Sequence, residues 1–218
     1  MELAGSRVLV VGATGVLGGL TACALAERGA QVALAGRNPV RLAALARDLG
    51  APPARSFEAC DLDQCTSLAT WAARMLSGLD GVLVTVGAMG FGAVEDVSNA
   101  AAEHLLTVNA LCPMAVLRGA APVVADKGFL LAVTGTPPEQ SHIEGTADYT
   151  ASKAALSGWL GVLSEELAPR SVSVLDFRVP HLDTGCADRP LIGRPPALPP
   201  GADALKTALS LVEGIASA

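Results

Sequence analysis

The chain has 218 residues, of which 51% are hydrophobic and only 3% aromatic, a length and composition that fit one α/β domain and argue against disorder. Its formal net charge is −6, and its Lys and Arg residues form no cluster, so we expect no nucleic-acid partner. The five cysteines include no C-x-x-C pair, so we expect reduced thiols. The three histidines are scattered along the sequence, so we expect no metal site.

The first half of the chain alternates short apolar runs with segments of helical periodicity. A run of valine and leucine predicts a buried strand over residues 7–11, and apolar positions three and four apart predict a helix over 16–28, which Gly29 ends. The same alternation then predicts strands and helices in turn at 31–35, 39–49, 56–59, 65–76 and 81–86.

The second half continues this alternation after a glycine-rich loop at 87–92. A long helical pattern covers 100–121, with Pro113 inside it as a kink or a boundary. Residues 181–200 are rich in proline and glycine and have no periodicity, so we expect a surface loop that acts as a short lid. The remaining strands and helices are expected at 129–133, 147–167, 172–177 and 203–216.

This order of elements predicts the fold. Strands that alternate with helices imply right-handed crossovers and a parallel sheet covered on both faces. We therefore predict a doubly wound α/β fold with three layers (α/β/α) and six or seven strands. No linker divides the chain, so residues 1–218 are expected to form one domain. Because the start of the chain has no positive segment before its apolar run, and no uninterrupted apolar stretch is long enough for a bilayer, we expect a cytoplasmic protein without membrane contact.

Glycines recur at three-residue spacing between the first predicted strand and the first predicted helix. Glycine there permits a tight turn and lets a pyrophosphate approach the backbone, while the helix N-terminus offers free N–H groups and a positive dipole end. The turn therefore predicts a dinucleotide site, against the alternative of a purely structural turn. The residues expected to hold the cofactor in this segment are Gly12, Thr14, Gly15, Val16, Leu17 and Gly18.

Two residues at later strand ends bear on the choice of cofactor. A dinucleotide fold usually has an acidic residue at the tip of the second strand, where it accepts the ribose 2′-hydroxyl. Here Arg37 stands in that region and could pair with a 2′-phosphate, so we predict NADP(H) in preference to NAD(H), with NAD(H) left open. Asp61 follows the third predicted strand and could accept from the adenine amino group or cap the next helix; both alternatives stay open.

Tyr149 and Lys153 are four residues apart at the start of the helix predicted over 147–167, and so share one helical face. A nearby ammonium is expected to stabilise the phenolate and lower the tyrosine pKa from about 10. Such a phenol can give a proton to a carbonyl oxygen or take one from an alcohol, while hydride moves to or from the cofactor.

Together these features resemble the short-chain dehydrogenase/reductase family over almost the whole chain, and the resemblance implies a Rossmann fold. It is carried by the glycine turn, Asp61, Asn109, the segment from Tyr149 to Lys153, and Pro180 with Thr184. The residues that the resemblance adds to the expected cofactor site are Asp61, Leu62, Val86, Gly87, Ala88, Asn109, Tyr149, Lys153, Pro180 and Thr184.

The family's catalytic tetrad of Asn, Ser, Tyr and Lys maps onto Asn109, Tyr149 and Lys153 at three positions. The resemblance implies that Asn109 holds a water that links Lys153 to solvent, that Lys153 binds the nicotinamide ribose, and that Thr184 contacts the carboxamide. The serine position, thirteen residues before the tyrosine, is Thr136 here. A threonine hydroxyl can still donate to a substrate carbonyl, and Thr134 and Ser141 are alternatives if the loop is offset.

We therefore expect an NADP(H)-dependent reductase, or the reverse dehydrogenase, acting on a small-molecule carbonyl or alcohol. Val16 replaces a glycine of the family's turn, and the family's last strand is missing from the predicted elements, which leaves the oligomeric state open, a homodimer included. These departures motivate the alternative of a non-catalytic module that senses NAD(P). A third interpretation, an epimerase or dehydratase acting on a nucleotide sugar, fits the glycine spacing but would need a larger second lobe.

Overall fold

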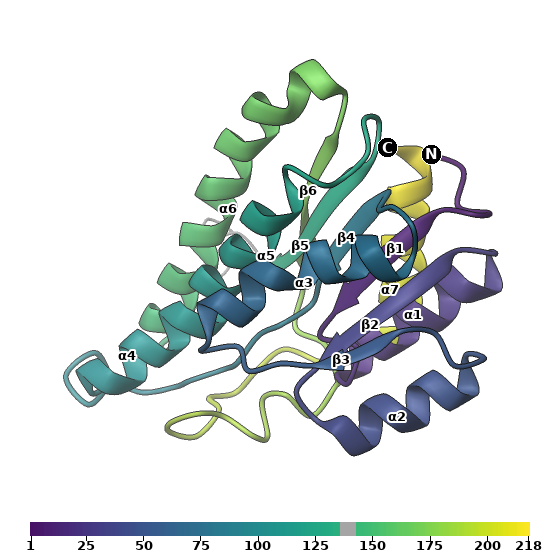
Figure 1. Ribbon diagram of the computed structural model, residues 1–218. Helices are drawn as coiled ribbons and strands as arrows, with labels where there is room; N and C mark the ends of the chain where they lie inside the picture. The colour runs from purple at the N-terminus through teal and green to yellow at the C-terminus, as the bar shows by residue number, and fades with distance from the viewer. Residues whose placement is uncertain (136–142) are drawn as a thin grey trace.

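The computed structural model describes residues 1–135 and 143–218. A parallel sheet of six strands in the order β3-β2-β1-β4-β5-β6 forms the middle layer, and helices cover both of its faces (Figure 1). This confirms the predicted doubly wound fold with three layers. The strands are β1 (Arg7–Val11), β2 (Gln31–Gly36), β3 (Ala54–Ser56), β4 (Gly81–Val84), β5 (Phe129–Gly135) and β6 (Ser173–Val179).

The helices pack on the sheet through two separate apolar clusters. Leu9 and Val11 of β1 point to one cluster, whereas Val8 and Val10 point to the other, which is why the strand is apolar at successive positions. The first cluster lies under α3, α5 and α6, and the second under α1 and α7. The helices are α1 (Val16–Glu27), α2 (Pro39–Asp48), α3 (Leu62–Met75), α4 (Asn99–Leu106), α5 (Cys112–Ala120), α6 (Ala147–Leu167) and α7 (Ala204–Ser217).

The prediction for the third strand is wrong by two to three residues. A strand was expected over 56–59, but β3 is Ala54–Ser56 and pairs only with β2, at the edge of the sheet. Its residues are exposed or half-buried, so no apolar run marks it. The buried Phe57 follows the strand and packs in the core. Helix α3 also begins three residues before its predicted start, because Asp61 caps it.

The long helix predicted over 100–121 is interrupted. Between α4 and α5 lies a π-helical turn, Thr107–Leu111, and Pro113 falls in the first turn of α5, where a missing N–H is tolerated. By length and composition alone the stretch Asn99–Ala120 could cross a bilayer, contrary to the sequence expectation. Just over half of its most apolar 18-residue window is buried inside the fold, as is usual for a helix that packs in a core.

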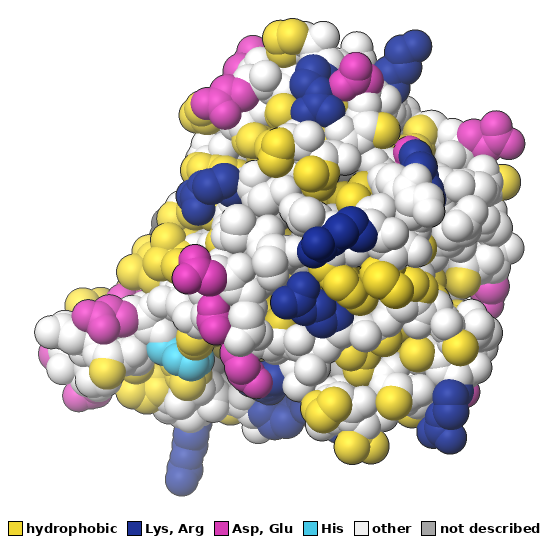
Figure 2. Space-filling model, viewed as in Figure 1, with side chains coloured by type: hydrophobic (Ala, Val, Ile, Leu, Met, Phe, Trp, Pro, Cys, Tyr) yellow, Lys and Arg dark blue, Asp and Glu magenta, His cyan; other side chains and the backbone are white. Residues whose placement is uncertain are grey.

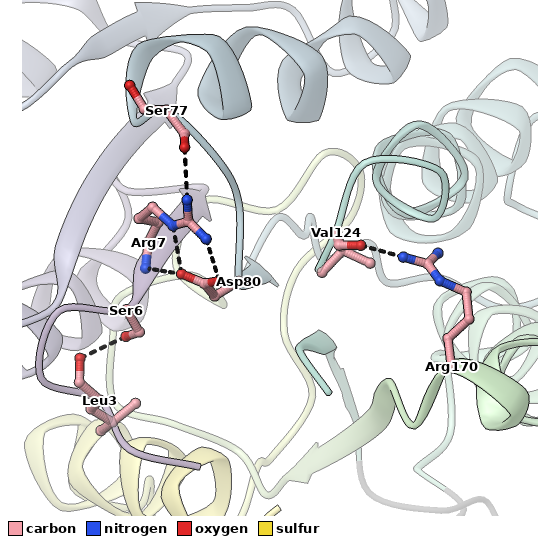
Figure 3. A network of polar contacts seen from close by, with 7 residues as sticks. All are labelled: Leu3, Ser6, Arg7, Ser77, Asp80, Val124 and Arg170. Atoms are coloured by element: carbon pink, nitrogen blue, oxygen red, sulfur yellow. Dashed lines mark hydrogen bonds and ion pairs between the residues drawn. The ribbon is translucent and has the colours of Figure 1, made fainter. Parts of the chain in front are cut away.

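Arg7 and Asp80 join the starts of the central strands β1 and β4, at the end of these strands away from the glycine turn (Figure 3). Arg7 Nε and Nη2 donate to the two carboxylate oxygens of Asp80 at 2.7 Å, and the Arg7 backbone N–H donates to the same carboxylate at 2.8 Å. Arg7 Nη1 also donates to the carbonyl of Ser77 at 2.7 Å. These hydrogen bonds hold the pKa of Asp80 below its usual range.

We expect Asp80→Asn to lower the free energy of unfolding by about 2 kcal/mol at pH 7, because it leaves the half-buried Arg7 without its carboxylate. Since the pKa of Asp80 is lowered in the folded state, its contribution is complete above the unfolded-state value of about 4 and disappears as pH falls through the folded-state pKa. Urea unfolding of the unchanged chain and of Asp80→Asn, measured from pH 7 down to acid, should therefore show that the difference between their free energies of unfolding becomes smaller.

Asp126→Asn is the matched control for this prediction. Asp126 also pairs with an arginine, Arg170, at 2.8 Å, but its side chain is 72% exposed, so its loss should cost less than about 1 kcal/mol. Equal losses for the two variants, or a difference at Asp80 that persists in acid, would contradict the assignment.

Candidate active site

A cavity of about 870 Å³ lies at the carboxyl ends of the strands. The loops after β1, β2, β4 and β6 contribute to its wall, together with the last residues of β5. It spans the point between β1 and β4 where the strand order reverses. Ligands of doubly wound sheets bind at this position. The face shown in Figure 2 carries acidic and basic side chains interspersed with apolar ones, so its charge is not concentrated in one area.

The glycine turn after β1 forms one end of the cavity and is packed too closely for side chains. Gly12 has a φ of +94°, and a Cβ there would lie 2.5 Å from the hydroxyl oxygen of Thr85. A Cβ on Gly18 would overlap the carbonyl oxygen of Gly12. Helix α1 then begins without a side-chain cap, which leaves its first N–H groups available to an anion. The turn therefore fits a pyrophosphate.

Most of the residues that the sequence predicts for the cofactor site line this one cavity. They are Gly12, Thr14, Gly15, Val16, Leu17, Gly18, Arg37, Val86, Gly87, Ala88, Tyr149, Lys153, Pro180 and Thr184. The turn is also fitted to the end of β2, because a Cβ on Gly36 would lie 2.6 Å from the Thr14 methyl. Asp61, Leu62 and Asn109 do not line the cavity.

Arg37 is exposed at the end of β2 and lines the cavity together with Arg41. Arg41 was not expected in the site; it lies in the first turn of α2 (Pro39–Asp48), whereas Arg37 precedes that helix. Asn38 fixes the start of α2 between them: its side-chain oxygen accepts from the Arg41 N–H at 3.0 Å. Two guanidinium groups thus border this end of the cavity, where Glu58 is the one acidic residue among the described lining residues.

Asp61 caps helix α3, so the capping alternative for this residue is confirmed. Its carboxylate accepts from the Gln64 backbone N–H at 3.0 Å and from the Gln64 side chain at 2.7 Å. Glu58, Ala59 and Cys60 line the cavity just before it. A contact between Asp61 and an adenine ring stays a prediction, and Leu62 is half-buried at the first position of α3.

Asn109 lies fully buried in the π-helical turn, beneath the loop that follows β4. Its amide nitrogen donates to the Ala88 carbonyl at 2.9 Å and to the Ser152 hydroxyl at 3.0 Å, and its amide oxygen accepts from the Ala88 N–H at 2.8 Å. The side chain thereby ties the 87–92 loop to α6. That Asn109 also holds a water linked to Lys153 stays a prediction.

Tyr149 and Lys153 both reach the cavity from the first turns of α6. The Lys153 ammonium donates to the Val133 carbonyl at 3.2 Å, at the end of β5, and the Tyr149 hydroxyl lies 3.7 Å from the position of a Cβ on Gly135. The pair therefore faces the carboxyl end of β5, as the mapping from the family implies. A phenol at this place can give or take a proton inside the cavity.

The expected lowering of the tyrosine pKa is wrong for the chain by itself. Burial raises the pKa of Tyr149 to about 12 and lowers the pKa of Lys153 to about 8, because water is partly excluded from both groups. Desolvation thus outweighs the stabilisation that an ammonium gives a phenolate. At neutral pH the phenol is protonated and most of the amine is charged.

Three residues were candidates for the serine position of the family's tetrad, the hydroxyl that would act beside Tyr149. Thr136 and Ser141 lie outside the described residues. The third candidate, Thr134, is buried, lines the cavity and donates its hydroxyl hydrogen to Asp176 on β6. Its proton is therefore already engaged, which disfavours Thr134 as a donor to substrate.

The segment after β6 also borders the cavity. His181, Thr184, Cys186 and Arg189 line the wall there. The segment is held to the loop after β4 by backbone hydrogen bonds from Leu191 to Met89 at 2.7 Å and from Phe91 to Ile192 at 3.0 Å. Cys186 and Arg189 were not expected in the site, since no motif marks them.

Comparison with known proteins points to one family. A family model described as short chain dehydrogenase matches residues 6–189. The chain is 29% identical over 177 residues to nodulation protein G of Rhizobium meliloti (strain 1021), covering 79% of this chain and 71% of that protein. It is 28% identical over 184 residues to the 3-oxoacyl-(acyl-carrier-protein) reductase FabG of Rickettsia bellii, covering 80% and 71%.

Solved structures agree with these relatives. A short-chain oxidoreductase structure from Thermus thermophilus is 30% identical, with a TM-score of 0.82, and the match covers 96% of this chain and 95% of that one. A short chain dehydrogenase from Burkholderia cenocepacia J2315, in complex with NADP, has a TM-score of 0.85 at 23% identity over 99% and 92% of the two chains. The second likeness shows the shared fold.

Proposed function

Because the chain belongs to the short-chain dehydrogenase family, we propose that it is an NADP(H)-dependent oxidoreductase that interconverts a small-molecule ketone and a secondary alcohol. The observation that carries the proposal is that the glycine turn and the Tyr149–Lys153 pair open into one cavity. When bound, NADP(H) would supply or accept the hydride. Residues of the glycine turn, with Arg37 and Arg41, would hold it.

In the proposed reaction Tyr149 moves the proton at the substrate oxygen. Its raised pKa keeps the phenol protonated at neutral pH, so in the reductive direction it donates its proton to the carbonyl oxygen as the alcohol forms. Lys153 holds a positive charge near the phenol and would contact the ribose. Asn109 fixes the 87–92 loop against α6, and the segment 181–200 would act as the lid that limits access of water.

The experiment that tests this function is oxidation of NADPH in the presence of a panel of ketones, quinones and acyl thioesters, with Tyr149→Phe as the control. Turnover of any panel member that depends on Tyr149 would support it. Cofactor binding without turnover of any panel member would instead favour the alternative, a module that senses the cofactor. Turnover that is unchanged in Tyr149→Phe would refute the assigned mechanism.

Preference for NADPH over NADH is a separate prediction, which rests on Arg37. We expect Arg37→Asp to lower the ratio of NADPH to NADH affinity by about 10- to 100-fold, because a charged hydrogen bond to a 2′-phosphate contributes about 1.5–3 kcal/mol. Fluorescence titration with each cofactor measures the ratio. Arg41→Ala should lower it less, since Arg41 lies in the first turn of α2, further along the chain from the end of β2.

Arg47→Asp is the matched control for Arg37→Asp. Arg47 is exposed in the last turn of α2 and is not among the lining residues, so the same change of charge should leave the ratio as it is. If both variants lower the ratio alike, the effect is one of overall charge; if Arg37→Asp leaves it unchanged, Arg37 does not meet the 2′-phosphate.

A further inference from the structure

Asp176 on β6 accepts hydrogen bonds from three directions, just behind the wall of the cavity. One carboxylate oxygen accepts from the Thr134 hydroxyl on β5, and the other accepts from the Ser157 hydroxyl on α6 and from Arg178 Nε at 3.0 Å. Arg178 Nη2 also donates to the Ser157 hydroxyl at 3.2 Å. The carboxylate is thus fixed between the sheet and α6.

This carboxylate is close to the cavity without forming its wall. Thr134, Ser157 and Arg178 line the cavity, whereas Asp176 does not. The Asp176 side chain is only 19% exposed, while Arg178 is 51% exposed. A carboxylate that is shielded in this way is unsuited to contact substrate, but its charge acts across a region of low dielectric.

Lys153 is connected to the hydrogen bonds around Asp176 through two elements, α6 and β5. Ser157 is one helical turn beyond Lys153 on the same face of α6. On β5, the Val133 carbonyl accepts a hydrogen bond from the Lys153 ammonium, and the hydroxyl of the next residue, Thr134, donates to Asp176. Lys153 and Asp176 are therefore hydrogen-bonded to adjacent residues of the same strand.

We propose that Asp176 is a positioning residue for Lys153: its fixed carboxylate supplies the negative charge that keeps the buried amine in its ammonium form. The inference rests on the proposed role of Lys153 in catalysis. Such a partner is needed because burial by itself favours the neutral amine.

The groups that face Lys153 leave Asp176 as the anion that acts on it at neutral pH. Tyr149 on its own helix is protonated, and Asn109 from the π-helical turn is neutral. Cys186 approaches from the segment after β6, but burial raises the pKa of its thiol, so it too is neutral. Burial brings the pKa of Lys153 down to about 8, while negative charge on Cys186 and on Asp176 raises it; with the Cys186 thiol neutral at pH 7, the Asp176 carboxylate is the charge that remains. Among the described residues that interact with Lys153, no other anion opposes burial at pH 7.

The proposal predicts opposite shifts for two neighbouring substitutions. Asp176→Asn removes the negative charge but keeps the size of the side chain, so the pKa of Lys153 should fall. Arg178→Gln removes the positive charge that partly offsets Asp176, so the pKa of Lys153 should rise, by less because Arg178 is more exposed to solvent. Damage to the fold would not produce shifts of opposite sign.

The shift can be measured without turnover. The chain has three lysines, Lys127, Lys153 and Lys206, so titration of ¹³C-labelled lysine side chains by NMR resolves each one, and Lys153→Arg assigns the signal. In the reductive assay the ammonium is the active form. The alkaline limb of the kcat profile should therefore move to lower pH in Asp176→Asn and to higher pH in Arg178→Gln.

An unchanged Lys153 titration in a folded Asp176→Asn protein would overturn the proposal, even if activity is lost. Should Asp176→Asn not fold, the direction of the shift in Arg178→Gln decides, and a fall or no change there would also overturn it. Ser157→Ala keeps both charges and should move the pKa least. If the enzyme turns over no substrate but the NMR shifts appear, the proposed function fails, and what stands is the electrostatic effect of Asp176 on the Lys153 ammonium.

Discussion

Replacing Tyr149 with phenylalanine is expected to lower kcat for carbonyl reduction by about 10³-fold, the usual size of a lost general acid, with little change in cofactor affinity. Phenylalanine keeps the ring that fills this part of the cavity and removes only the hydroxyl that faces the end of β5. Steady-state kinetics with the best substrate of the panel, together with cofactor titration, measures both quantities. A drop in cofactor affinity as large as the drop in kcat would contradict the assignment.

The pKa of the Tyr149 phenol can also be measured directly. Tyr149 is the single tyrosine of the chain, so the phenolate absorbance of the whole protein reports this site alone, and Tyr149→Phe removes the signal. In the protein without cofactor we expect the phenol to titrate with a pKa of about 12, raised by burial. A midpoint near 10 or below would show that the ammonium of Lys153 outweighs desolvation.

Gly18→Ala is expected to raise the cofactor dissociation constant by about 100-fold and to destabilise the fold by about 1–3 kcal/mol. The added methyl group would overlap the Gly12 carbonyl oxygen and lie 2.6 Å from the Thr85 hydroxyl oxygen. Because the first of these is backbone, the turn itself must open, and the N–H groups at the start of α1 would move away from a pyrophosphate. Cofactor titration and urea unfolding measure the two effects.

Gly161→Ala makes the same chemical change where the fold has room. A Cβ at Gly161, on the exposed side of α6, meets nothing within 4 Å, and alanine in a helix interior is more favourable than glycine by about 0.5–1 kcal/mol. This variant should therefore be slightly more stable and bind cofactor normally. If Gly18→Ala behaves in the same way, the turn does not need the close approach that the structure shows.

The sequence was most informative where burial and periodicity coincide. The strands at the centre of the sheet, such as β1 and β4, are buried on both faces and appear as unbroken apolar runs. The prediction of the third strand was wrong because β3 has only three residues, lies at the edge of the sheet and contains no apolar run. The π-helical turn was also missed, since its apolar positions fit a helical pattern and the added residue changes only which of them face inward.

For the candidate site, spacing along one element could be read and contacts between elements could not. The distance from Tyr149 to Lys153 along a helix follows from sequence alone, and so does the glycine turn. The connection from Lys153 through Val133 and Thr134 to Asp176 joins α6, β5 and β6, and no local pattern encodes it. The tyrosine pKa was wrong for the same reason, because burial depends on the whole fold.

The π-helical turn over Thr107–Leu111 affects how related sequences are aligned. It contains one residue more than a regular α-helical turn, and each added residue rotates the later part of the helix by about 100° around its axis. A relative with an unbroken α-helix here can match the inward face of α4 or that of α5, but not both without a gap. Where that gap is placed decides whether Asn109 is paired with its true counterpart.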